Sequence, residues 1–158
     1  MARVPDPVPG LIFRYGYLWL EEFRKQRTDP AKDRPACIAM QVVGSQNPNL
    51  PVAGSAALAP GDVIIFPITI QPPRFGDIAI ELSADEKRLC RLDPASPSWL
   101  IVSEFNADSW PNPDLSLIPG TNEIAYGLAS PGLMKRIARK FAEARQRGTV
   151  LGVKRFGG

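Results

Sequence analysis

The stretch Gly61-Asp-Val-Ile-Ile-Phe-Pro-Ile-Thr-Ile-Gln-Pro-Pro73 is the most apolar run of the chain. Its β-branched residues, the Gly-Asp turn before them and the double proline after them predict a buried strand. Pro67 has no backbone N–H to donate, so we expect a bulge or a sheet edge at this residue. Thr69 stands at the end of the strand, where the chain leaves the sheet. Because polar side chains at strand ends often face a cleft, Thr69 is a candidate functional residue.

Upstream of this run the pattern predicts two further strands and two connections. Residues 1–9 are punctuated by prolines and predict an extended arm. Residues 11–19 place aromatic side chains at every second position, which predicts a long strand. Residues 21–33 hold eight charged side chains and predict an exposed, mobile loop. Residues 36–43 form a second apolar run that predicts a strand, and the long connection 44–60 is interpreted as either functional or without fixed structure.

Downstream, local signals predict a strand, a short helix and another strand. Residues 77–82 alternate apolar and polar side chains. Ser83 and Glu86 form a capping-box pattern, which predicts a short helix that ends near Leu89. Residues 99–105 alternate again and predict one continuous strand.

The last part of the chain predicts one long amphipathic helix after two short strands, at residues 115–118 and 126–128. Ser130-Pro131 places an N-cap before a proline at the first helical position, and the helix is expected to end at Gly148. Its apolar stripe consists of Leu133, Ile137 and Phe141, flanked by Met134, Ala138 and Ala142. Its basic face consists of Lys135, Arg136, Arg139, Lys140 and Arg145.

This order of elements predicts a single domain, residues 1–158, of mainly β composition in the α+β class. Strands come first and a helix comes last, which favours a small twisted sheet or a partly open barrel closed at one end by the helix. Residues 1–9 form the arm and residues 149–158 a C-terminal tail. At 158 residues the chain is long enough to bury a core without disulfides or a metal.

Composition narrows the function classes. The chain has two cysteines and no histidine, so neither a disulfide scaffold nor a zinc site is expected, and we expect no metal and no cofactor. Cys37 lies in an apolar run and is interpreted as a small buried hydrophobe. The sequence shows no secretion signal, and its apolar segment at residues 11–20 contains a charge and is too short to span a bilayer. We therefore expect no membrane association and a cytoplasmic protein.

The net charge of +3 is unevenly distributed. From Lys135 onward there are eight Lys or Arg and one Glu, a net charge of +7, which leaves −4 for residues 1–134. The basic end is consistent with an acidic partner or RNA, and equally with a solvated helix face.

Without histidine, acid–base chemistry would fall to carboxylates, tyrosine or solvent. Arg34 at a strand start, Thr69 at a strand end and Glu104 on an otherwise apolar face are the main candidates. The other candidates are the acidic residues of the charged loop, Glu21, Glu22, Asp29 and Asp33.

The order of these motifs resembles the MazF/PemK family of toxins from type II toxin–antitoxin systems. The resemblance covers residues 10–147 and rests on an aromatic strand after Gly10, a charged loop, and four motifs in order. These motifs are Asp33-Arg34-Pro35-Ala36, Phe66-Pro67-Ile68-Thr69, the strand residues 101–104, and Leu128-Ala129-Ser130-Pro131 before the helix.

The resemblance implies a small SH3-like barrel, usually a homodimer, that cleaves single-stranded RNA without a metal and is inhibited by an acidic antitoxin. It implies catalytic roles for Arg34 and Thr69, and for Glu104 as the base that takes the proton of the 2′-hydroxyl. The remaining expected RNA contacts are Arg14, Lys32, Gln71 and Arg74. An arginine can bind two phosphate oxygens at once, and a threonine hydroxyl can donate a third hydrogen bond.

Each of these residues also has a structural interpretation. Arg34 can pair with the neighbouring acidic loop, Thr69 can serve as a strand former, and Glu104 can be a solvated outward residue. Two further function classes stay open, a gyrase-inhibiting toxin and a non-catalytic binding module of the same barrel fold. The homodimer is also favoured by the predicted first strand, which carries aromatic residues on one face and Ile12, Leu18 and Leu20 on the other, more than a small barrel buries alone.

Overall fold

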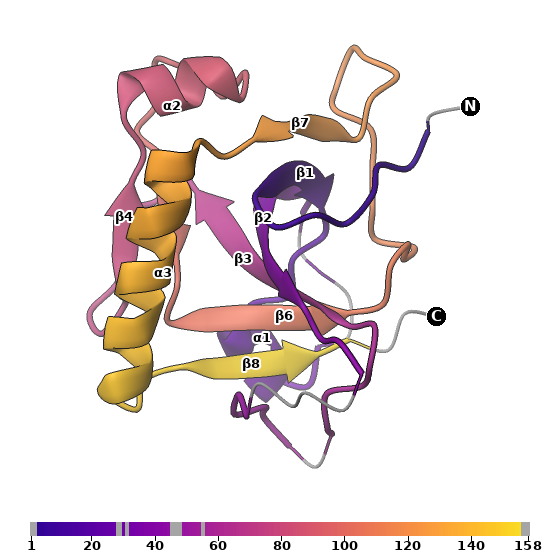
Figure 1. Ribbon diagram of the computed structural model, residues 1–158, viewed down its shortest axis with the longest axis vertical. Helices are drawn as coiled ribbons and strands as arrows, with labels where there is room; N and C mark the ends of the chain where they lie inside the picture. The colour runs from indigo at the N-terminus through magenta and orange to yellow at the C-terminus, as the bar shows by residue number, and fades with distance from the viewer. Residues whose placement is uncertain (1–2, 28–29, 31, 45–48, 55, 156–158) are drawn as a thin grey trace.

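The computed structural model describes residues 3–27, 30, 32–44, 49–54 and 56–155, and within them the chain folds into eight strands and three helices (Figure 1). The strands are β1 Leu11–Tyr15, β2 Arg34–Gln41, β3 Val63–Thr69, β4 Ala79–Glu81, β5 Trp99–Ile101, β6 Glu104–Asp108, β7 Ala125–Leu128 and β8 Leu151–Lys154. The helices are α1 Leu20–Arg24, α2 Ala84–Leu89 and α3 Pro131–Gln146. The predicted α+β class is confirmed.

Strand β3 is the centre of the sheet, and all seven of its residues are buried. It pairs with β2 along one edge, and along the other with β6 over residues 63–65 and with β5 over residues 68–69. Pro67 lies between these two segments, so its missing N–H falls where the neighbouring strand changes. The sheet irregularity predicted at Pro67 is instead found in β2, between Ile38 and Met40.

The sheet is mostly antiparallel and runs in the order β4-β5-β3-β2-β1-β7, with β6 and β8 attached beside β3. The pairing of the described strands does not close into a barrel, because β4 and β7 each pair with one strand. Helix α3 lies beside β4 and the core (Figure 1). It begins at Pro131 with Ser130 as the N-cap, as predicted, and buries the apolar stripe Leu133, Ile137, Phe141 and Ala144. No helix in the described ranges is long and apolar enough to cross a membrane.

The prediction of one long strand over residues 11–19 is wrong after Tyr15. β1 ends at Tyr15, and residues 20–24 form helix α1 where the sequence predicted a loop. Both faces of β1 are buried within the chain, since Ile12 packs into one apolar core and Phe13 into the other. Leu18 is buried as well. This strand therefore leaves no large apolar face to argue for a dimer.

Three further expectations are corrected by long-range pairing. Residues 99–105 divide into β5 and β6, because Val102 and Ser103 turn toward Ile78, whose carbonyl and N–H they bind. The predicted C-terminal tail contains β8, which pairs in parallel with β6. Residues 115–118 form only an isolated bridge, between Leu115 and Tyr15. The expected short strand at 126–128 is confirmed as β7, and the helix capped by Ser83 is confirmed as α2.

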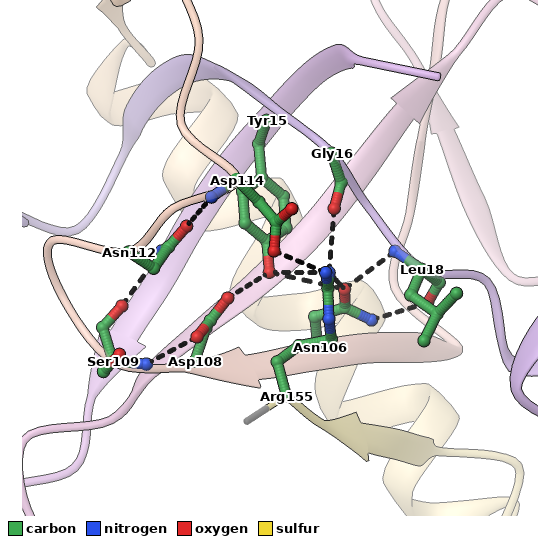
Figure 2. Close-up of polar contacts among 9 residues, drawn as sticks. All are labelled: Tyr15, Gly16, Leu18, Asn106, Asp108, Ser109, Asn112, Asp114 and Arg155. Atoms are coloured by element: carbon green, nitrogen blue, oxygen red, sulfur yellow. Dashed lines mark hydrogen bonds and ion pairs between the residues drawn. The ribbon is translucent and has the colours of Figure 1, made fainter. Parts of the chain in front are cut away.

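A row of polar side chains on β6 fixes the segment between β1 and α1. Alternate residues of a strand point to the same face, so Glu104, Asn106 and Asp108 all face this segment. Asn106 accepts from the Leu18 N–H at 2.9 Å and donates to the Leu18 carbonyl at 2.7 Å, while Asp108 accepts from the Tyr15 hydroxyl at 2.7 Å (Figure 2). The side-chain amide of Asn106 thus makes the two backbone hydrogen bonds of Leu18 that a neighbouring strand would otherwise make.

The guanidinium of Arg155, just after β8, completes this cluster (Figure 2). It donates to the Tyr15 hydroxyl at 3.1 Å, the Gly16 carbonyl at 2.8 Å and the Asn106 side chain at 3.0 Å. It also forms an ion pair with Asp114 at 2.5 Å. The C-terminal end of the described chain is thereby fixed to the segment that leads into α1.

Candidate active site

A cleft with a volume of about 330 Å³ lies where α1, the start of β2 and the end of β3 meet. We call it the Arg34 cleft. It collects five of the seven residues predicted to form the site. Its walls are Trp19, Glu21, Glu22, Lys32, Arg34, Thr69, Gln71, Pro72, Pro73, Arg74, Asp77 and Ile101.

Arg34 is the first residue of β2 and is placed opposite Tyr15 of β1. Its guanidinium lies 5.0 Å from the ring centre of Trp19. Among the described residues its side chain makes no hydrogen bond or ion pair, and its Nε is buried without a partner. Burial lowers the pKa of Arg34, although the charge of Glu22 opposes this. A half-buried guanidinium whose donors have no acceptor among the described residues can bind an anion, because burial has removed part of its water without supplying a hydrogen-bond partner.

Thr69, the last residue of β3, lies beside this cation in the cleft and is 7% exposed. Its Oγ1 accepts from the Gln71 N–H at 3.1 Å, and within the described chain its own hydroxyl proton has no acceptor. The hydroxyl is therefore oriented by the backbone and can donate to a ligand. The prediction that Thr69 faces a cleft is confirmed.

Arg74 is held differently from Arg34, by acidic partners on several sides. Its Nη1 lies 2.6 Å from Glu21 Oε2, and its other nitrogens lie 3.8 Å from Asp77 Oδ2 and 3.9 Å from Glu104 Oε2. The hydrogen bond from Arg74 lowers the pKa of Glu21. Arg74 is thus paired with carboxylates on several sides, whereas Arg34 has no ion pair among the described residues.

Trp19 was not predicted as a site residue, because it continued the aromatic alternation of the expected first strand. Its indole ring contacts two guanidinium groups, that of Arg34 and that of Arg74 at 5.5 Å from the ring centre. Its backbone N–H donates to Glu22 Oε1 at 3.1 Å, which places the Glu22 carboxylate at the start of α1 in the cleft.

Glu104 is not part of the Arg34 cleft. Its Oε1 accepts from the Tyr17 hydroxyl at 3.1 Å and from the Leu20 N–H at 3.0 Å. The side chain is 7% exposed, and burial raises its pKa. Its carboxylate borders a separate hollow on the other side of Arg74. The two contacts of Glu104 Oε1 fix the start of α1, while its Oε2 lies 3.9 Å from Arg74, a residue of the Arg34 cleft that Glu104 itself does not line.

Some of the other predicted residues line the Arg34 cleft and some do not. Lys32 and Gln71 line the Arg34 cleft. Arg14 does not, since its side chain donates to the Tyr126 hydroxyl at 3.2 Å. Of the acidic loop, Glu21 and Glu22 line the cleft and Asp33 does not, while Asp29 lies outside the described residues.

The site therefore consists of a half-buried cation with no hydrogen-bond acceptor among the described residues, an oriented hydroxyl, an aromatic wall and nearby carboxylates. These groups can bind a phosphate and accept a proton beside it. Comparison of the whole chain with family models, with curated proteins and with solved structures gave no match.

Proposed function

We propose that this protein is the toxin of a toxin–antitoxin system, a metal-independent endoribonuclease that cleaves single-stranded RNA at selected sequences. The observation that carries the proposal is the half-buried Arg34 guanidinium, whose Nε has no hydrogen-bond partner in the described chain and which shares its cleft with the Thr69 hydroxyl. A buried donor atom without an acceptor costs free energy, so a ligand that supplies an anion to Arg34 would stabilise this arrangement.

The proposed reaction uses the 2′-hydroxyl of the substrate as the nucleophile. A base removes its proton, the 2′-oxygen bonds to the adjacent phosphorus, and the bond from phosphorus to the 5′-oxygen breaks. The 5′-oxygen takes up a proton, which leaves a 2′,3′-cyclic phosphate and a 5′-hydroxyl. Arg34 would bind the phosphate oxygens as negative charge builds up on them, and Thr69 would donate a further hydrogen bond.

The base is assigned to Glu22 in preference to Glu104. Both carboxylates are held by a backbone N–H, but Glu22 lines the cleft of Arg34 and Thr69 and Glu104 does not. The charge of Glu22 also acts on Arg34, because it partly offsets the lowering of the Arg34 pKa by burial. The Gln variants of the two residues separate the assignments, since Gln keeps the hydrogen-bond acceptor and removes the base.

The remaining parts of the proposal come from the resemblance. They are a variant of the SH3-like barrel, a homodimer, action in the cytoplasm and inhibition by an acidic antitoxin. The basic face of α3 is less available to such a partner than its sequence suggests, because Arg136 is bound to Glu86 at 2.9 Å and to the Glu81 carbonyl at 3.1 Å. Light scattering of the pure protein at micromolar concentration tests the dimer, and a monomer mass would count against it.

The test of the proposal is incubation of the pure protein with RNA of mixed sequence in the presence of EDTA. We expect cleavage at few sites, and a loss of a hundredfold or more for Arg34→Ala, as is typical when a transition-state charge contact is removed. The matched control is Arg88→Ala, which removes an arginine that is 76% exposed and whose one ion pair among the described residues is with Asp85 on α2. Equal cleavage by the parent and Arg34→Ala would refute the proposal. RNA binding without cleavage would favour a non-catalytic module.

A further inference from the structure

Phe75 is the most exposed large apolar side chain in the described chain. It lies in the connection between β3 and β4, next to Arg74. Its ring borders a second hollow of about 480 Å³, which we call the Phe75 hollow. The hollow is lined by Leu20, Glu21, Arg24, Lys25, Arg74, Phe75, Asp77 and Glu104. An aromatic ring in water does not gain the favourable free energy of burial, so the exposure of Phe75 suggests a ligand that covers the ring.

Phe75 is exposed because it lies in a turn whose two ends, Arg74 and Asp77, are hydrogen-bonded to each other. The Arg74 N–H donates to Asp77 Oδ2 at 2.8 Å, and the Asp77 N–H donates to the Arg74 carbonyl at 3.0 Å. Gly76 has a φ of +91°, a conformation that glycine adopts without strain. The preceding prolines, Pro72 and Pro73, restrict the backbone further. The turn presents the ring outward and opposes its folding back onto the protein.

The Phe75 hollow adjoins the Arg34 cleft, because Glu21, Arg74 and Asp77 line both. Arg24 and Lys25 of α1 border the Phe75 hollow. The hollow also holds three carboxylates, those of Glu21, Asp77 and Glu104, which lie 2.6, 3.8 and 3.9 Å from Arg74, and Glu21 also pairs with Lys25. An extended ligand that enters the Arg34 cleft can continue past Arg74 into this hollow, which offers the cation of Arg24 and one aromatic face. Proteins that bind single-stranded nucleic acid combine these two features, cations for the phosphates and aromatic rings for the bases.

We propose that Phe75 is a stacking platform for a base of single-stranded RNA, next to the nucleotide whose phosphate lies at Arg34. This inference rests on the proposed function and extends it, since it makes the substrate at least two nucleotides long and unpaired at the second. A base in a duplex is stacked on its neighbours and cannot place its face on Phe75. The continuity of this hollow with the Arg34 cleft, where the phosphate is expected, favours RNA over an apolar protein segment as the occupant.

The test is the affinity of the purified protein for a fluorescently labelled, single-stranded 2′-O-methyl RNA of mixed sequence, which lacks the nucleophile. We expect Phe75→Ala and Phe75→Leu to weaken binding roughly ten- to a hundredfold, and Phe75→Trp to bind as the parent does, because stacking needs a flat ring. Duplex RNA should bind more weakly and be insensitive to all three changes. Since the ring is exposed, the urea midpoints of the variants should match that of the parent.

Parental affinity of Phe75→Leu or Phe75→Ala would overturn the inference, and would leave a protein contact as the use of this ring. The experiments distinguish a failure of this inference from a failure of the proposed function. Cleavage by the parent with no effect at Phe75 refutes the stacking platform alone. Binding that depends on the aromatic ring, without any cleavage, supports the platform and refutes the nuclease. A parent protein that binds no RNA refutes both.

Discussion

Replacement of Arg155 by Ala should destabilise the protein strongly, although this residue lies at the far end of the described chain. The Arg155 side chain is 7% exposed and donates to four groups, on Tyr15, Gly16, Asn106 and Asp114. The truncation removes one hydrogen bond from each of these groups and leaves Asp114 without its cation.

The expected magnitude follows from these contacts. Removal of one partner of a buried ion pair costs about 3–5 kcal/mol, because an uncompensated charge and unpaired polar groups remain. Asp114 keeps partial access to water, with 26% of its side chain exposed, which places the estimate near the lower end, about 3 kcal/mol. For a domain of this size such a loss lowers the melting temperature by roughly 6–12 °C.

Urea unfolding followed by tryptophan fluorescence measures this loss. The matched control is Arg88→Ala, whose exposed ion pair with Asp85 should contribute less than about 1 kcal/mol. Asp114→Asn combined with Arg155→Met should recover part of the stability lost in Arg155→Ala, since it removes the uncompensated charge and restores apolar volume. A change of less than about 1 kcal/mol for Arg155→Ala would refute the assigned role of this cluster.

Three further predictions concern packing, thiol reactivity and pH. Gly152→Ala should destabilise the protein by about 2–3 kcal/mol in urea unfolding, because a Cβ there would lie 2.2 Å from the ring of Phe105; an unchanged midpoint would contradict this packing. Burial raises the pKa of Cys37 to about 12 and also raises that of Cys90, so at pH 8 a thiol-reactive probe should label neither cysteine in the folded protein and both in urea. Burial raises the pKa of Glu104, so the folded state binds its proton more tightly than the unfolded state does. The stability of the parent relative to Glu104→Gln should therefore be greatest below pH 4.5 and fall as the pH rises through the raised pKa; a difference that stays constant with pH would exclude this effect.

Local signals in the sequence predicted the elements whose ends are set by their own residues. The capping pattern at Ser83 and the Ser130-Pro131 start gave the positions of α2 and α3, because an N-cap acts within one turn of the helix. The apolar run from Gly61 gave β3 for a similar reason, since a strand buried on both faces must be apolar throughout.

Elements set by distant contacts were not predictable in this way. The aromatic alternation of residues 11–19 continues past Tyr15, but the chain leaves the sheet there because Asn106 binds the backbone of Leu18. Strand β8 forms through parallel pairing with β6, and its own four residues, Leu151–Lys154, are too short a run to predict a strand. No local pattern encodes either contact.

In the candidate site, too, some residues were predictable from local sequence and others depend on distant contacts. Arg34 and Thr69 were predicted because they stand at strand ends, and the sheet brings these ends together. The Arg34 cleft also contains Trp19, which the sequence assigned to a strand face. Glu104 was expected as the base, and it does not line the Arg34 cleft; one of its two carboxylate oxygens, Oε1, accepts from Tyr17 and Leu20, which lie more than eighty positions away in the sequence.

The central claim is that the Arg34 cleft cleaves RNA by using the substrate's own 2′-hydroxyl. The most direct measurement compares two versions of one short RNA that contains a mapped cleavage site, with ribose or with a single 2′-deoxyribose at the attacking nucleotide. We expect the first to be cut in EDTA to a product that ends in a 2′,3′-cyclic phosphate, and the second to bind with similar affinity but remain intact at that site. Cleavage of the 2′-deoxy version at the parental rate, or no cleavage of any RNA, would contradict the claim.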